Sequence, residues 1–206
     1  MNKVIDIRAF ADPTSVPILV FIDLQQEYIA DSRALALSTS SNALRQCRKA
    51  LMHARAIGLP IAFVRWVGRS PFFNQSTKFA SWIEGFEPTG SDMVFERSLP
   101  SCYASERFHE VVDSSGGNIV LAGFAGETAC LSTAIDAFHR GHRATYLADA
   151  SASHSLDGIA ESQVHPIISK VVGVYGDVIQ TAQWICATSS NGPGIKLVTN
   201  LPGRIA

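Results

Sequence analysis

Residues 118–138 read NIVLAGFAGETACLSTAIDAF, and this stretch decides the fold. The apolar, β-branched run at 118–122 predicts a buried strand. Glycines at positions 123 and 126 favour a tight turn, and from Thr128 onward apolar residues recur at helical spacing. The stretch is therefore predicted to be a strand, a turn and a helix, with Cys130 in the first turn of that helix.

A cysteine at this place in a helix has two interpretations. Unpaired backbone N–H groups and the positive end of the helix dipole stabilise a thiolate and any oxyanion formed beside it, which would suit acyl transfer. Alternatively, Cys130 is a small apolar residue that packs the helix against the sheet, which is the commoner role of a free cysteine.

The rest of the chain alternates between the same two patterns. Strands are predicted at 16–23, 61–66, 93–96, 118–122, 144–147 and 171–174, and helices at 38–57, 105–112, from 128, around 157–169 and from Asp177. This alternation predicts a three-layer, Rossmann-like α/β fold, with a mostly parallel six-stranded sheet and helices on both faces. We expect one domain over residues 1–206, with an N-terminal arm at 1–14 and a C-terminal tail at 187–206.

Composition excludes several classes of function. Of the 206 residues, 17% are charged, the formal net charge is -1 and no basic run occurs, which argues against nucleic acid or an anionic membrane as partner. No stretch approaches the roughly 20 apolar residues of a membrane span, and residues 1–14 lack a secretory apolar core. The four cysteines lack zinc or disulfide-scaffold spacing, so a reducing cytoplasm is the expected setting.

Reactive side chains follow several of the predicted strands. Asp23 ends the first strand, Arg97 follows the third, and Cys130 follows the fourth. The carboxyl ends of parallel strands lie at one edge of a sheet, where α/β proteins place their sites. These three side chains are therefore expected to converge.

Four segments resemble the isochorismatase-like hydrolase superfamily, which includes nicotinamidases, carbamoylsarcosine amidases and isochorismatases. They read DLQQEY at 23–28, DMVFERSLPSCY at 92–103, GFAGETACLSTAIDAF at 123–138 and DASAS at 149–153. The resemblance covers residues 17–174. It implies that the protein is a hydrolase of a small molecule and that it forms a homodimer or homotetramer.

Two positions depart from the family pattern. Arg97 stands where the family has a catalytic lysine, and Ala129 stands at the usual nucleophilic cysteine, with Cys130 one place later. One residue along a helix rotates a side chain by about 100°. Ala129 is then either native, as in isochorismatases that use no thiol, or a replacement of an original cysteine.

Three functions follow from the resemblance. In the favoured one, a cysteine at the 129/130 turn cleaves a C–N bond of amide or carbamoyl type, and Asp23 takes the thiol proton and later activates water. In the second, protonated Asp23 donates a proton to a vinyl ether while Arg97 holds a carboxylate. In the third, the chain binds a ligand without catalysis.

The resemblance also implies the remaining site residues. A cis Phe124–Ala125 peptide would form an oxyanion hole with the N–H of Ala129 or Cys130. The expected substrate-binding residues are Gln25, Tyr28, Trp66, Tyr103, Phe124 and Ala125. Residues 64–69 lack the histidine of the nicotinamidase zinc site and 123–126 lack the full dinucleotide pattern, so neither a metal nor a cofactor is expected. Phe72 and Phe73 are candidates for an aromatic pocket wall or for the core.

Overall fold

The computed structural model describes residues 15–69 and 71–189. Their strands form a six-stranded sheet in the order β3-β2-β1-β4-β5-β6, and every neighbouring pair is parallel. This confirms the predicted α/β class. The strands are β1 (Ile18–Ile22), β2 (Ile61–Trp66), β3 (Met93–Arg97), β4 (Asn118–Gly123), β5 (Arg143–Ser151) and β6 (Asp177–Ile179).

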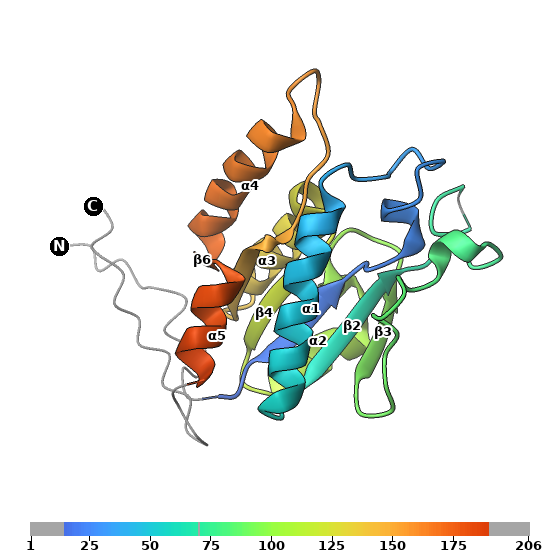
Figure 1. Ribbon diagram of the computed structural model, residues 1–206. Coiled ribbons are helices and arrows are strands. Elements are labelled where there is room, and N and C mark those ends of the chain that lie inside the picture. The colour runs from blue at the N-terminus through green and yellow to red at the C-terminus, as the bar shows by residue number, and fades with distance from the viewer. Residues whose placement is uncertain (1–14, 70, 190–206) are drawn as a thin grey trace.

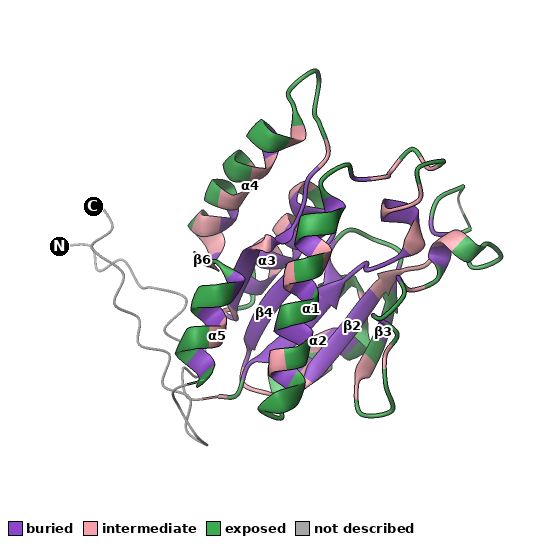
Figure 2. Cartoon of the chain, viewed as in Figure 1, coloured by how far each residue is buried: buried purple, intermediate pink, exposed green. Residues whose placement is uncertain are grey.

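Helices cover both faces of the sheet (Figure 1). One face packs against α1 (Ser40–Ala56) and α5 (Thr181–Ser189), and the other against α2 (Glu106–Ser114), α3 (Leu131–His139) and α4 (Glu161–Tyr175). Because side chains alternate along a strand, Leu19 and Phe21 join the first core and Ile18 and Val20 the second. Figure 2 shows the central strands as a buried layer between these helices, whereas the edge strand β3 is partly exposed. The two cores hold the strand ends in place.

The C-terminal elements differ from the prediction. Residues 171–174 belong to α4, and the sixth strand is β6 at 177–179, followed by α5 from Thr181. The β-branched run at 171–174 suggested a strand, but Ile168 and Val172 meet the second core four residues apart, and Val164, four residues earlier, is also buried, which is helical spacing. Residues 187–189 end α5, and the predicted arm at 1–14 and the rest of the tail lie outside the described residues.

Within residues 15–69 and 71–189, no helix is both long and apolar enough to cross a bilayer. The same residues contain no group of three or more histidine, cysteine, aspartate or glutamate side chains placed to hold a metal ion.

Candidate active site

The strand order reverses direction between β1 and β4, so the crevice beyond their carboxyl ends is where a ligand is expected. Backbone contact holds the two strand ends together there. Gly123 has φ +111°, and a Cβ on it would lie 2.1 Å from the carbonyl oxygen of Ile22, so only glycine fits. The N–H of Phe124 donates to that same carbonyl at 2.8 Å. Asp23 and the turn after β4 are consequently neighbours.

Asp23 follows β1 and is fully buried. Its backbone lies in the left-handed region, with φ 47°, and is held by hydrogen bonds from Asp23 N to Val64 O at 2.8 Å and from Gln25 N to Asp23 O at 2.7 Å. Oδ2 accepts from Arg97 Nη2 at 2.5 Å, whereas Oδ1 has no hydrogen-bond partner among the described residues. Burial raises the pKa of Asp23 to about 6, and the positive charge of Arg97, the backbone N–H of Trp66 and the hydrogen bond from Arg97 oppose that rise only in part. Asp23 can therefore exchange a proton near neutral pH.

Arg97 pairs with Asp23 and is not among the residues that line the cavity described below. Its side chain is 0% exposed, it ends β3, and Nη1 donates to the carbonyl of Leu99 at 2.6 Å. The guanidinium carbon lies 4.9 Å from the ring centroid of Trp66, and Trp66, unlike Arg97, lines that cavity. A clamp of Arg97 on a substrate carboxylate stays a prediction. Arg97 holds Oδ2 and leaves Oδ1 free.

A cavity with a volume of about 310 Å³ lies beside Asp23. Its walls are mainly aromatic and apolar, and Asp23 is the only carboxyl group among its lining residues. The lining residues are Asp23, Tyr28, Leu35, Trp66, Phe72, Phe73, Pro100, Thr128, Ala129 and His154. The structure thus brings together Asp23, Tyr28, Trp66 and Ala129 of the predicted site.

Tyr28 offers a hydrogen-bond donor to this cavity. Its ring packs against Phe73 and Phe124, with centroids 5.3 and 5.6 Å away, which places Phe124 behind the wall and not in the cavity. No described residue hydrogen-bonds to the Tyr28 hydroxyl. Burial and the nearby charge of Asp23 raise the pKa of Tyr28 well above its usual 10. The hydroxyl therefore remains neutral and can donate to a substrate oxygen.

The turn after β4 separates Ala129 from Cys130. It is a π-helical turn, η5 (Gly126–Cys130), preceded by a cis Phe124–Ala125 bond. The carbonyl of Ala125 accepts from the N–H groups of Thr128 at 3.3 Å and Cys130 at 3.2 Å, so the Cys130 N–H is not available to an oxyanion. Ala129 lines the cavity, whereas Cys130 does not.

The thiol of Cys130 belongs to the core. It is fully buried, and Sγ lies 3.6 Å from the Gly123 carbonyl and 3.8 Å from Ser151 Oγ. Burial raises the pKa of the Cys130 thiol far above its usual value, and burial also raises the pKa of Cys102 to about 11. Of the two interpretations of Cys130, the structure therefore favours packing over a thiolate at the site.

Two other predicted contact residues lie outside the cavity. The Gln25 amide nitrogen donates to the carbonyls of Trp66 and Ala80 at 2.9 Å each, and its oxygen accepts from the Trp66 N–H at 2.9 Å. Gln25 thus orients Trp66 and has no group left for a substrate. Tyr103 bonds through its hydroxyl to His142 Nδ1 at 2.7 Å and packs in the second core.

The sequence analysis missed four residues of the wall, namely Leu35, Pro100, Thr128 and His154. Two of these carried a signal, because Thr128 lies within the family turn and His154 directly follows the DASAS segment. Leu35 and Pro100 come from loops with no motif of their own, so only the tertiary structure identifies them.

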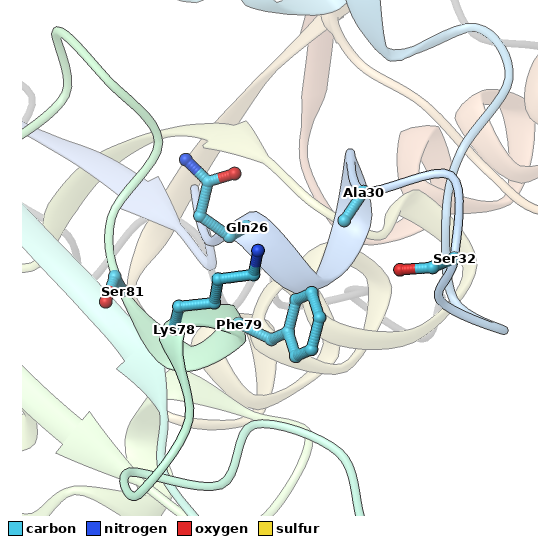
Figure 3. Close-up of a pocket in the computed structure, with 6 residues that line it drawn as sticks. All are labelled: Gln26, Ala30, Ser32, Lys78, Phe79 and Ser81. Atoms are coloured by element: carbon cyan, nitrogen blue, oxygen red, sulfur yellow. The ribbon is translucent and has the colours of Figure 1, made fainter.

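A second cavity, with a volume of about 360 Å³, lies between η2 (Gln26–Tyr28) and η3 (Lys78–Ala80). Figure 3 shows the Lys78 and Gln26 side chains and the Phe79 ring at its edge. Lys78 is the only ionisable residue that lines it. With no carboxyl group, imidazole or thiol, it offers less chemistry than the cavity at Asp23.

Together the parallel sheet, the buried carboxyl group at the switch point and the tight turn define an α/β enzyme with acid–base capacity. A family model described as the Isochorismatase domain matches residues 17–174, and the chain belongs to the isochorismatase family. It is a hydrolase of that family.

Solved structures agree with this assignment. An isochorismatase from Pseudomonas putida KT2440 is 27% identical, with a TM-score of 0.76 over 82% of this chain and 89% of its own. A cysteine hydrolase from Pseudomonas syringae pv. phaseolicola 1448A shares 18% identity, with a TM-score of 0.77 over 88% and 95% of the two chains. N-carbamoylsarcosine amidase from Thermoplasma acidophilum shares 22%, with a TM-score of 0.65 over 80% and 96%. No curated protein matches the chain.

Proposed function

We propose that the chain hydrolyses a small, largely apolar vinyl ether by acid catalysis at Asp23. The observation that carries this proposal is the state of the Asp23 carboxyl group: its pKa is about 6, and its Oδ1 has no hydrogen-bond partner among the described residues. It lies beside a cavity that no described cysteine lines. A group with this pKa is partly protonated near neutral pH, as a general acid must be.

The reaction needs only a proton and water. Asp23 protonates the alkene carbon of the vinyl ether, which leaves an oxocarbenium ion. Water adds to that ion, the extra proton returns to Asp23, and the resulting hemiketal separates into a ketone and an alcohol. Arg97 holds the other carboxylate oxygen, so the proton leaves from and returns to Oδ1. The Tyr28 hydroxyl donates to the ether oxygen, and Trp66, Phe72 and Phe73 enclose the apolar part of the substrate.

C–N hydrolysis is the second candidate, because position 129 lines the cavity beside Asp23 and neighbours of this fold include a cysteine hydrolase and an amidase. This chemistry requires a thiol in the cavity. With alanine at 129, Cys130 would have to turn out of the core to provide one. The buried position of the Cys130 thiol therefore argues for acid catalysis.

The pH profile separates the two candidates. Substrate panels of vinyl ethers and of amides are incubated with the protein, and products are followed by mass spectrometry. For acid catalysis, kcat/KM falls as pH rises through about 6, because Asp23 loses its proton there. We expect Asp23→Asn to lower kcat by about 10²- to 10⁴-fold, and Glu96→Gln on the exposed edge strand to leave it unchanged. Activity that rises with pH and disappears in a folded Cys130→Ser variant would establish the thiol mechanism instead.

A further inference from the structure

His154 lies in the cavity wall and contacts two separate parts of the chain. Its Nδ1 is 2.6 Å from Glu127 Oε1, in the turn after β4. Its Nε2 is 3.0 Å from the carbonyl oxygen of Leu35, in the segment between η2 and α1. Both Leu35 and His154 line the cavity beside Asp23. His154 thus joins two sides of the cavity wall.

These contacts determine the protonation of the ring. A backbone carbonyl only accepts hydrogen bonds, so Nε2 must carry a proton. Glu127 lies in η5 and is largely buried. Burial alone would raise the pKa of Glu127, but hydrogen bonds from His154, from the Glu127 backbone N–H and from Ser153, together with the charge of His154, lower it overall. An ionised Glu127 also only accepts, so Nδ1 carries a proton as well. His154 is therefore an imidazolium.

Few other groups act on this ring. The charged or titratable groups near it are Glu127 of η5, Glu161 of α4 and Tyr28 of η2, whose ring centroid is 6.0 Å away, and Asp23, after β1, lines the same cavity. The bond to Glu127 raises the pKa of His154, burial opposes that rise, and the bond to Leu35 and the charges of Glu127 and Glu161 add to it. His154 therefore loses a proton at a higher pH than an ordinary histidine.

The segment that carries Leu35 is also hydrogen-bonded to α4, through Ser38 and Glu161. Glu161 Oε2 accepts from Ser38 Oγ at 2.6 Å, and Oε1 accepts from Ser38 N at 3.3 Å. When His154 loses a proton, the negative charge of Glu127 keeps the remaining one on Nδ1. The bare Nε2 lone pair then faces the Leu35 carbonyl oxygen, and two acceptors repel. The contact at Leu35 is then lost, while the bonds of Arg33, Leu37 and Ser38 still hold the ends of this segment.

We infer that His154 is a positioning residue whose imidazolium form holds the Leu35 wall against the Glu127 turn, so that the cavity is enclosed only while both ring nitrogens carry protons. The inference deepens the proposed function, because this wall encloses the substrate of Asp23. Its test needs no substrate and is independent of the reaction catalysed.

The first measurement is NMR of the full-length protein with ¹⁵N-labelled histidine rings. At pH 7 we expect the two His154 nitrogens to give imidazolium signals, and at higher pH we expect Nε2 alone to lose its proton. The second is hydrogen exchange of the peptide that covers 29–37, corrected for the intrinsic effect of pH. Its protection should fall about tenfold across the His154 titration, which corresponds to losing one charge-assisted hydrogen bond.

Variants make the assignment specific. His154→Gln should give low protection of 29–37 at every pH, and Glu127→Gln should move the loss of protection to lower pH. His139→Gln, at an exposed site on α3, is the matched control and should behave as the unmodified protein. Asp23→Asn should lower the rate of hydrolysis as stated above without changing exchange, which separates this inference from the proposed function. A neutral His154 at pH 7, or equal protection of 29–37 at all pH values in the unmodified protein, overturns the inference.

Discussion

Replacing Arg97 with methionine should destabilise the protein in a way that depends on pH. In the unmodified protein, Asp23 has a pKa of about 6, above the value of about 3.9 in an unfolded chain. The folded state therefore binds this proton more tightly. The contribution of Asp23 to stability is most favourable below about pH 4, decreases by about 3 kcal/mol as pH rises to about 6, and is constant above that.

The charge of Arg97 determines the pH at which the contribution of Asp23 to stability stops decreasing. Two charges about 4 Å apart interact by about 4 kcal/mol at an effective dielectric constant of about 20. Without Arg97, the pKa of Asp23 would rise well above its present value, because the nearby positive charge no longer favours the carboxylate. At pH 5 Asp23 is largely protonated in both proteins, so its ionisation adds almost nothing to the difference in stability. At pH 8 only the unmodified protein carries the charge, and the difference is larger by about 3 kcal/mol.

The assay is urea unfolding at pH 5 and pH 8, followed by circular dichroism. The loss of the contacts from Arg97 to Trp66 and to the Leu99 carbonyl costs stability equally at both pH values, so the difference between the two pH values isolates Asp23. Arg65→Met is the matched control, because Arg65 pairs with Glu96 on the neighbouring strand at the surface. It should cost less than about 1 kcal/mol at either pH. An Arg97→Met effect of equal size at pH 5 and pH 8 would refute the argument that Arg97 holds Asp23 ionised.

Two further predictions concern the thiols and the assembly. Iodoacetamide should label exposed Cys186 quickly and buried Cys130 only as fast as the protein unfolds, and Ala129→Cys should add a rapidly labelled site beside Asp23. Peptide mapping distinguishes the labelled cysteines. Equal labelling rates at Cys130 and Cys186 would contradict the buried position of Cys130. We also expect a homodimer or homotetramer that packs through α4, whose exposed apolar residues include Ile167, Val171 and Val174. Light scattering should give a multiple of 22.2 kDa that falls on Ile167→Glu, and a monomer mass for the unmodified protein would reject the assembly.

The sequence was sufficient to predict the fold class and the closeness of Asp23 to the turn after β4. Parallel strands have a common polarity, so the residue that ends β1 and the turn that follows β4 must lie at one edge. Asp23 could be singled out for the same reason, because it is a carboxylate directly after an apolar run that predicts a buried strand. The sixth strand was misplaced because β-branched residues suit both a buried strand and the apolar face of a helix.

The orientation of side chains within the site could not be predicted in the same way. A π-helical turn changes the rotation per residue, so helical spacing does not show which of Ala129 and Cys130 faces the cavity. Gln25 and Tyr103 are polar residues close to family motifs. Their partners, the backbone of Trp66 and the ring of His142, are 41 and 39 residues away in the sequence, and only folding brings them together.

The contact at Gly123 has a consequence for how enzymes of this design can diversify. There the main chains of β1 and β4 touch, so the spacing between Asp23 and the turn does not depend on any side chain in the cavity. Side chains at 97, 129 and 130 can then be exchanged while the acid and the turn keep their relative positions. A change of reaction type is therefore accessible through single substitutions, whereas a residue larger than glycine at 123 would separate the two halves of the site.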